Sequence, residues 1–377
     1  MKLIELEQFL KEYNHNNTPD NFDDFLNITQ VRQGMKLTPL KKYIEKNNKS
    51  IEHLKNLHKN ILLKEKYLTR FYNTSLKVKP EFLKITKTPM ENKLMNNNIE
   101  INYKNVIRNI HYKDILENTR SGIDNIPTYL QVLTDLYKNN IIDYKLLTPS
   151  ALLYINNGRI GSIFSSFFFR ASIMNPYLVY SLNEELLKGT KIFTPTLGWT
   201  SYLFGFLESN MVKSYVGTDV IPDVCSKTEE FSKRYNKKVK IYCKPSEELL
   251  KMPSFARQYK GYFDVVFFSP PYYKLELYSS DNQSTDKYNT YEKWLTHYWE
   301  ETIKLAYYVL ERGGRLCYIL SGYGSDNTKQ KYDLIKDMNN ITRKYFSLKD
   351  KQPMYNKNVN VTKHKETNEM IMYFIKD

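Results

Sequence analysis

The sequence predicts an α/β fold in which a mainly parallel, Rossmann-like sheet with helices on both faces follows a mainly helical N-terminal region. Two observations carry this prediction. Before about residue 145, apolar side chains recur at helical spacing. After residue 185, short β-branched and aromatic runs alternate with helical stretches, as in a parallel sheet whose strands are joined by helices. We therefore expect a helical, basic region over residues 1–145 and a sheet-containing domain over residues 146–377.

The N-terminal region contains a long amphipathic pattern. Apolar side chains from Ile51 to Tyr72 recur at steps of three and four residues, with Lys and Glu between them. Thr38-Pro39 is a suitable helix start just before this pattern. Residues 36–120 hold 19 Lys/Arg against 8 Asp/Glu, a surplus of 11 positive charges. This surplus fits either a solvated helix pair or a surface that faces nucleic acid.

The C-terminal part contains a series of short strand patterns. The run FDVVFFS at 263–269 consists mainly of apolar, β-branched and aromatic residues, which is typical of a strand buried on both faces. In such a sheet ligands bind beyond the carboxyl ends of the strands, so the residues just after each strand are candidates for a site. The other predicted strands cover 191–197, 214–220, 237–243, 315–322 and 369–375, with a helix over 201–209 between the first two.

A longer helix is predicted from Tyr291 to Glu311. Asn289 with Glu292 forms a capping-box pattern at its start. Gly313-Gly314 is expected to end it, because glycine commonly follows the last turn of a helix.

Composition restricts the class of protein and its partners. The chain has 377 residues, 41% of them hydrophobic, so it can bury a sizeable core. Its formal net charge is +15, which favours binding to a polyanion such as nucleic acid. An anionic membrane would be attracted by the same charge, but we expect no membrane association. The sequence does not predict an oligomeric state.

The cysteines and histidines predict neither a disulfide framework nor a metal site. Cys225, Cys243 and Cys317 are an odd set without short spacing, which fits a cytoplasmic or other reducing compartment. The first residues carry charges throughout and contain no apolar run of the signal-peptide type, so we do not expect secretion. The six histidines show no ligand spacing with Cys or carboxylates, and no metal is expected.

The strongest chemical signal is Ser269-Pro270-Pro271-Tyr272, directly after the predicted strand Phe263–Phe268. Two consecutive prolines fix an extended, rigid turn. That turn would hold the Ser269 oxygen and the Pro270 carbonyl as two acceptors aimed at one point. Such a pair suits an amino group that loses a proton as its nitrogen attacks a methyl group. The Tyr272 ring suits stacking on a base taken out of a duplex.

Two further signals follow the first two predicted strands. In FTPTLGWTSYLFGF, Gly198 and its neighbour Trp199 lie in a turn that leads into a helix, which allows backbone to approach a ligand closely. Asp219 comes 21 residues after Gly198 at the end of the next strand. A carboxylate at this point can accept both hydroxyls of a ribose.

These motifs resemble those of the DNA methyltransferases that modify exocyclic amino groups, the N6 of adenine or the N4 of cytosine. The family's catalytic motif is D/N/S-P-P-Y/F, and SPPYYKLELYS followed by QSTDKYNTYEKWL is similar to a subgroup found largely in phages and other viruses. The resemblance covers roughly residues 165–377. It implies a seven-stranded methyltransferase fold, S-adenosylmethionine as cofactor and DNA as partner. It also implies that Ser269, Pro270, Pro271 and Tyr272 are the catalytic set.

The resemblance assigns cofactor-binding roles to several loops. The turn at Gly198 and Trp199 would cradle the methionine part, but Thr194 stands where the family has an acidic residue, and only one of its glycines remains. Ser246 and Glu247 follow the third strand, where the family binds the adenine ring; a helix start is the alternative. The stretch 170–176, RASIMNP, resembles the segment that lines the cofactor pocket, with Asn175 and Pro176 as its candidates.

Two alternatives to DNA methylation stay open. An RNA base methyltransferase could share the fold and the Pro-Pro motif. A catalytically degenerate subunit with a binding or structural role would explain the missing glycines, although Ser269 to Tyr272 and Asp219 argue against it. Because the chain stops soon after the last predicted strand, residues 1–145 are the candidate for target recognition. The sequence does not distinguish adenine from cytosine as the target.

Overall fold

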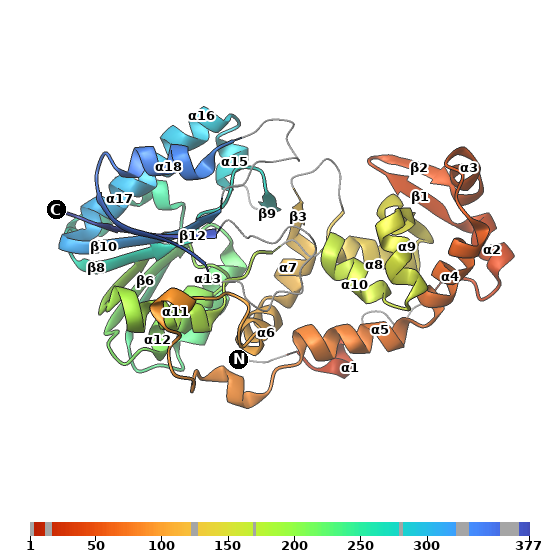
Figure 1. Ribbon diagram of the computed structural model, residues 1–377, viewed down its shortest axis with the longest axis horizontal. Helices are drawn as coiled ribbons and strands as arrows, with labels where there is room; N and C mark the ends of the chain where they lie inside the picture. Colours follow the sequence, from red (N-terminus) through yellow and green to blue (C-terminus); the bar gives the residue numbers. More distant parts are fainter. Residues whose placement is uncertain are drawn as a thin grey trace.

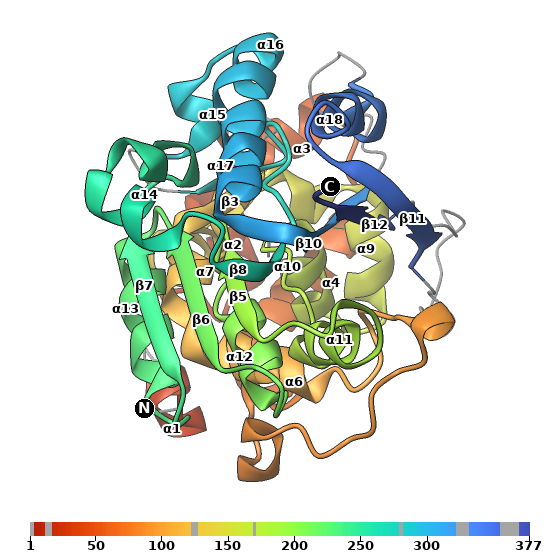
Figure 2. The ribbon, with the colours of Figure 1, turned by 90° about the vertical axis from the view of Figure 1, so that its left-hand side faces the viewer.

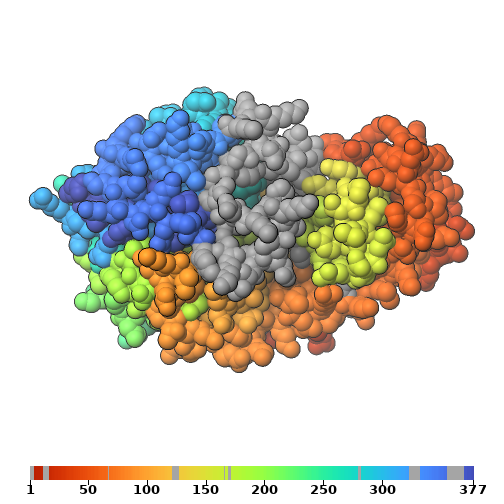
Figure 3. Space-filling view, viewed as in Figure 1, coloured from red at the N-terminus to blue at the C-terminus, as the bar shows by residue number. Residues whose placement is uncertain are grey.

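The computed structural model describes residues 4–11, 17–121, 127–168, 171–278, 282–321, 332–354 and 369–377. Two lobes lie side by side, a larger one built on a sheet and a smaller, mainly helical one (Figures 1 and 3). The larger lobe contains the predicted parallel sheet, and the smaller one is built mainly from the N-terminal part of the chain.

The large lobe is organised around one seven-stranded sheet. Its strand order is β11-β12-β10-β8-β5-β6-β7. The five strands from β10 to β7 are parallel, whereas β12 is antiparallel to both β10 and β11. The predicted fold class, a mainly parallel seven-stranded sheet with helices on both faces, is confirmed. The strands are β5 (Lys191–Thr194), β6 (Ser214–Asp219), β7 (Lys238–Cys243), β8 (Phe263–Phe268), β10 (Leu310–Ser321), β11 (Ser347–Pro353) and β12 (Glu369–Ile375).

Helices cover both faces of this sheet because its central strands are apolar on both sides. Every residue of β8 is buried. Helices α11, α12 and α13 lie on one face and α17 and α18 on the other (Figure 2). Their bounds are α11 (Pro176–Leu182), α12 (Ser201–Glu208), α13 (Pro222–Ser232), α17 (Glu301–Val309) and α18 (Leu334–Thr342), with α14 (Pro253–Tyr259), α15 (Ser284–Lys287) and α16 (Tyr291–Trp294) in the connections.

A buried carboxylate joins the starts of two central strands. Asp264 in β8 is 5% exposed and accepts hydrogen bonds from the backbone N–H groups of Thr190 and Lys191, both at 2.9 Å, and from the Thr190 hydroxyl at 2.7 Å. It therefore satisfies two backbone donors where the chain enters β5.

We expect Asp264→Ala to lower the free energy of unfolding by about 2–4 kcal/mol, because it leaves buried donors without a charged acceptor. Asp264→Asn is the control, since it retains one acceptor oxygen and should lose less. Urea denaturation of both variants measures the difference. A loss below about 1 kcal/mol in the alanine variant would show that water replaces the carboxylate.

The small lobe combines helices with a short sheet that the sequence analysis did not predict. Strand β1 (Gln30–Gln33) lies between β2 (Lys36–Pro39) and β4 (Ile141–Asp143). Thr38-Pro39 ends β2, and a helix does begin next, at Leu40. The helices of this part of the chain are α1 (Leu6–Lys11), α2 (Phe22–Ile28), α3 (Leu40–Lys46), α4 (Ile51–Leu62), α5 (Lys64–Phe71), α6 (Asn102–Ile110), α7 (Tyr112–Asn118), α8 (Tyr129–Lys138), α9 (Pro149–Asn156) and α10 (Ile160–Phe167).

Helix packing joins segments on both sides of residue 145. Helices α9 and α10 follow that position yet pack against α4 and α5 of the small lobe. Helix α6 precedes it yet packs against α11 of the large lobe (Figure 1). The division into residues 1–145 and 146–377 therefore remains a proposal about function.

The helix predicted over residues 291–311 is capped and ends at other residues than the sequence predicts. Thr290, not Asn289, caps it, because the Thr290 hydroxyl accepts the backbone N–H of Lys293. A π-helical segment, Leu295–Glu300, lies between α16 and α17. The helix ends at Val309, and Gly313-Gly314 belongs to β10 instead of terminating the helix.

Candidate active site

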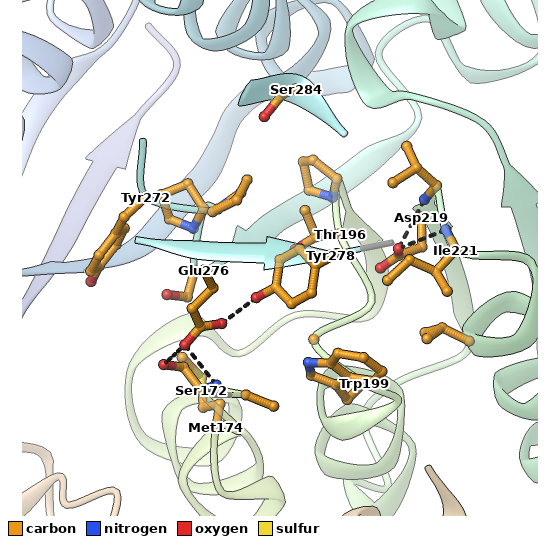
Figure 4. Close-up of a pocket in the computed structure, with 18 of the residues that line it drawn as sticks. Ser172, Met174, Thr196, Trp199, Asp219, Ile221, Tyr272, Glu276, Tyr278 and Ser284 are labelled. Atoms are coloured by element: carbon orange, nitrogen blue, oxygen red, sulfur yellow. Dashed lines mark hydrogen bonds between the residues drawn. The ribbon is translucent and has the colours of Figure 1, made fainter. Parts of the chain in front are cut away.

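A cavity of about 390 Å³ opens at the carboxyl ends of the sheet strands, within the size range of small-molecule sites. Residues just after β5, β6, β7 and β8 line it, as the sheet topology predicts (Figure 4). Of the sequence-predicted candidates, nine line the cavity: Gly198, Trp199, Asp219, Ser246, Glu247, Ser269, Pro270, Pro271 and Tyr272.

Hydrogen bonds on both sides fix Ser269 at the cavity wall. Its hydroxyl donates to the Ile319 carbonyl at 3.1 Å, and its backbone N–H donates to the Tyr202 hydroxyl at 3.1 Å. Because the Ser269 proton is used on Ile319, the oxygen presents its lone pairs to any further partner. Ser269 can therefore act as an acceptor, as the sequence predicts.

The Tyr272 side chain is fixed at its hydroxyl end. The oxygen accepts the backbone N–H of Ser321 at 2.7 Å, which ties the SPPY segment to the end of β10. Burial raises the pKa of Tyr272, so the phenol stays protonated. The side chain lines the cavity at its left in Figure 4.

The turn after β5 has an unusual backbone. Gly198, Trp199 and Thr200 are consecutive residues with positive φ, at 53°, 57° and 73°. Left-handed backbone is unfavourable for residues with a Cβ and accumulates at functional sites. A Cβ added to Gly198 would lie 2.3 Å from the Tyr202 ring, so glycine is required for space as well as for conformation.

A buried network stabilises this turn, and sequence reasoning missed it. The Thr200 hydroxyl lies 2.7 Å from His111 Nε2 and 2.6 Å from the Thr228 hydroxyl. His111 is fully buried, and its Nδ1 lies 3.3 Å from Asp114, which pairs with Lys227 at 2.6 Å. Burial lowers the pKa of His111, which favours the neutral ring. The N-terminal segment thus supports the turn that lines the cavity.

Asp219 lies at the end of β6 with its carboxylate facing the cavity. One oxygen accepts the backbone N–H groups of Val220 and Ile221 at 2.8 and 3.2 Å, and the other accepts that of Leu197 at 3.1 Å. These donors fix the carboxylate without using all its lone pairs. Burial raises its pKa, and the three N–H groups oppose that effect.

Ser246 and Glu247 line the cavity just beyond β7. The Ser246 hydroxyl is 3.1 Å from that of Thr302. Glu247 lies 3.6 Å from Lys287 and 3.4 Å from the Tyr288 hydroxyl. Burial raises the pKa of Glu247.

Three predicted residues lie behind the cavity and do not line it. Thr194 is fully buried, and its hydroxyl is 2.6 Å from that of Tyr215. Asn175 caps α11 by accepting the Tyr177 N–H and donating to the Ile99 carbonyl, and Pro176 is the first residue of that helix. The preceding residues, Ala171 to Met174, contact the cavity instead, while Arg170 lies outside the described residues.

Glu276 joins two walls of the cavity and was not predicted. One carboxylate oxygen accepts the Ser172 N–H at 3.0 Å and its hydroxyl at 2.5 Å, and the other accepts the Tyr278 hydroxyl (Figure 4). Glu276 and Tyr278 belong to β9 (Glu276–Tyr278), which pairs with β3 (Thr119–Ser121). The only sequence signal was their position shortly after SPPY.

A second unpredicted group consists of charged side chains from distant parts of the chain. Lys104 and Arg108 of α6 and Glu369 of β12 line the same cavity. Helical spacing in residues 102–110 predicts that positions 104 and 108 share a face, but nothing in the sequence joins them to residue 369.

Two further properties of the described part of the chain bear on function. No helix in it combines the length and apolar character that a membrane crossing requires. No group of three or more His, Cys, Asp or Glu side chains there is arranged to hold a metal ion.

No protein-family model and no curated protein matches this chain. Among solved structures, the N-methyltransferase NodS from Bradyrhizobium japonicum, in complex with S-adenosyl-L-homocysteine, is 12% identical with a TM-score of 0.34, over 53% of this chain and 83% of that one. TrmN from Thermus thermophilus is 12% identical with a TM-score of 0.36, over 54% and 49% of the chains. The cyclase SpnF reaches 0.38 at 12% identity, over 55% and 83%. Sequence identities and TM-scores this low do not indicate a shared activity. The fold class is assigned from the strand order and direction of the sheet.

Proposed function

We propose that this protein is an S-adenosylmethionine-dependent methyltransferase that modifies an exocyclic amino group, the N6 of adenine or the N4 of cytosine, in DNA. The observation that carries the proposal is the Ser269 hydroxyl at the cavity wall, with its proton directed to Ile319 and its lone pairs available. A carboxylate suited to ribose, Asp219, lies in the same cavity.

The mechanism needs acceptors more than a strong base. When bound, S-adenosylmethionine supplies a methyl group on a positively charged sulfur, already a good electrophile. Ser269 Oγ and the Pro270 carbonyl accept the N–H bonds of the target amino group and orient its lone pair toward that methyl group. As the new C–N bond forms and the C–S bond breaks, these acceptors stabilise the developing positive charge on nitrogen. The proton then leaves to solvent.

The cofactor roles follow the strand ends. Asp219 would accept the ribose hydroxyls, and Ser246 with Glu247 would contact the adenine ring. The backbone of Gly198 and Trp199 would approach the methionine part. Asn175 and Thr194 would act only by fixing the loops next to the cavity, because their side chains form hydrogen bonds within the protein. Pro176 would do so as the first residue of α11.

DNA is the proposed partner because of the basic charge and the resemblance of the SPPY segment to amino-group DNA methyltransferases. The small lobe, which carries much of the positive surplus of residues 36–120, is the proposed surface for target recognition. There are two alternatives to DNA methylation. The substrate is an RNA base, or the chain binds cofactor without transferring methyl groups.

The direct test incubates the purified chain with isotopically labelled cofactor and either DNA or RNA, followed by mass spectrometry of the released nucleosides. The proposal predicts labelled N6-methyldeoxyadenosine or N4-methyldeoxycytidine. Label in ribonucleosides alone would establish the RNA alternative. Cofactor binding without label in either nucleic acid would establish the degenerate one.

We expect Asp219→Ala to weaken S-adenosylmethionine binding by about 1.5–3 kcal/mol, the scale of a lost hydrogen bond to a charged group. Isothermal calorimetry measures this as roughly a 10- to 150-fold rise in Kd. The matched control is Asp223→Ala on the neighbouring helix α13, which starts at Pro222 and does not line the cavity through that residue. Equal affinities for the wild type and Asp219→Ala would remove Asp219 from the cofactor site.

A further inference from the structure

Three charged side chains meet in the cavity wall: Lys104, Arg108 and Glu369. Lys104 is 7% exposed, and Arg108, one helical turn later on α6, is also partly buried. Lys104 lies close enough to Glu369 for each to favour the charged form of the other. The same cavity is also lined by Lys244 and by the carboxylates Asp219, Glu247 and Glu276. What distinguishes Lys104 and Arg108 is that they are two cations on one helix face, and both can bind an anionic group that enters the cavity beside them.

The sheet order places this cluster on the side away from the proposed ribose position. Asp219 ends β6, and SPPY follows β8, two strands further along. Glu369 begins the antiparallel β12, opposite Ser321 at the end of β10, and Ser321 is the residue that bonds Tyr272. Four strand spacings, roughly 19 Å, therefore separate the ends of β6 and β12. A methyl group presented at SPPY lies between them.

The target must then enter from the β10 and β12 side. In this arrangement the ribose lies at Asp219 and the methyl group lies at Ser269. The remaining part of the cavity wall, with Tyr272, Glu369 and the two cations, then faces the group that receives the methyl. A base stacked on Tyr272 carries its own sugar and phosphates, and the phosphates are the anionic part of a nucleotide.

We propose that Lys104 and Arg108 form a subsite for a backbone phosphate of the nucleotide that is methylated. This inference rests on the proposed function, and it makes the substrate a phosphate-bearing nucleotide in a strand instead of a neutral amine. Arg108 supplies a planar fork that matches phosphate oxygens, and Lys104 supplies a point charge. Burial and the neighbouring Arg108 lower the pKa of Lys104 to about 8, so most of it is charged at neutral pH.

The test compares Lys104→Met and Arg108→Met with Lys293→Met, which removes an exposed charge on α16 of the large lobe. Each cavity variant should raise KM for a duplex about tenfold. Each should also reduce the slope of log binding constant against log salt concentration by about one, as expected for the loss of one phosphate contact. Their affinity for S-adenosylhomocysteine should stay within twofold of the wild type. Arg108→Lys should recover most of the loss.

The other anion that could occupy this subsite is the carboxylate of the cofactor's methionine part. If so, the Met variants would lose affinity for S-adenosylhomocysteine but keep it for 5′-methylthioadenosine, which lacks that part, and the proposal would be overturned. Unchanged KM and salt slope would overturn it too. Should a Met variant not fold, Lys104→Gln and Arg108→Gln give the same comparison with a hydrogen-bonding side chain. A wild type that binds cofactor but methylates no nucleic acid is a separate result, which refutes the proposed function itself.

Discussion

Ser269→Ala should lower the rate of methyl transfer by about 10²- to 10³-fold, the scale of losing one preorganised polar group at a reacting centre. In the proposed mechanism the Ser269 oxygen acts only on the amino group, and the proposed cofactor contacts lie on other strands. Affinity for S-adenosylmethionine should therefore stay nearly intact. Single-turnover kinetics on DNA at saturating cofactor separate the rate from the affinity.

Tyr272→Ala is the informative comparison for Ser269→Ala. It removes the stacking ring, worth about 1–3 kcal/mol per base, and should mainly weaken productive binding of the target. If both variants transferred methyl groups at the wild-type rate, the SPPY segment would be a structural turn. The proposal of an amino-group methyltransferase would then lose its main support.

Gly198→Ala should affect two parts of the site with one methyl group. Alanine at a φ of 53° costs about 1–2 kcal/mol. The added Cβ also meets the buried Tyr202 ring, and overpacking of this kind costs about 1–3 kcal/mol more. Because the Tyr202 hydroxyl accepts the Ser269 N–H, displacing this ring also shifts the SPPY segment. We expect the variant to lose both cofactor affinity and rate, and to unfold at lower temperature.

Tyr202→Phe separates these effects. It leaves room at Gly198 unchanged but removes the bond to Ser269, so it should lower the rate with little change in cofactor affinity. Burial raises the pKa of Tyr202 to about 12, so the hydroxyl stays protonated over the usual assay pH range. The effect of Tyr202→Phe therefore reports loss of the hydroxyl group and not a change in its protonation. Wild-type cofactor affinity in Gly198→Ala would show that the turn relaxes around the methyl group.

The strand ends explain which part of the site could be predicted from the sequence. Asp219, Ser246 and Ser269 each lie at or just after the end of a predicted strand, and parallel strands bring such positions to one edge. Thr194 was a candidate only through the resemblance, and in the structure its hydroxyl lies 2.6 Å from that of Tyr215 inside the core. Asn175 carries the ordinary signal of a helix cap, and in the structure that is the contact it makes.

The unpredicted part of the site depends on contacts between distant segments. His111 supports Thr200 from 89 residues away, and no local pattern distinguishes it from a surface histidine. Glu369 lies near Lys104 only because β12 runs antiparallel between β10 and β11. The predicted strand at 369–375 had the right bounds, but its direction follows from topology and not from its own residues. Strand β11 was not predicted, because its polar sequence resembles a loop.

The placement of β12 also bears on the order in which the site forms as the ribosome makes the chain. The strands β5, β6, β7 and β8 lie within residues 191–268, so the proposed cofactor half can assemble from a contiguous segment. Helix α6 emerges early, but its partner Glu369 emerges more than a hundred residues after β8. The entropic cost of closing such a long loop must be met before the contact can form. Contacts between segments this far apart in the sequence therefore form slowly. We therefore expect the wall that contains Glu369 to form later than the strands from β5 to β8.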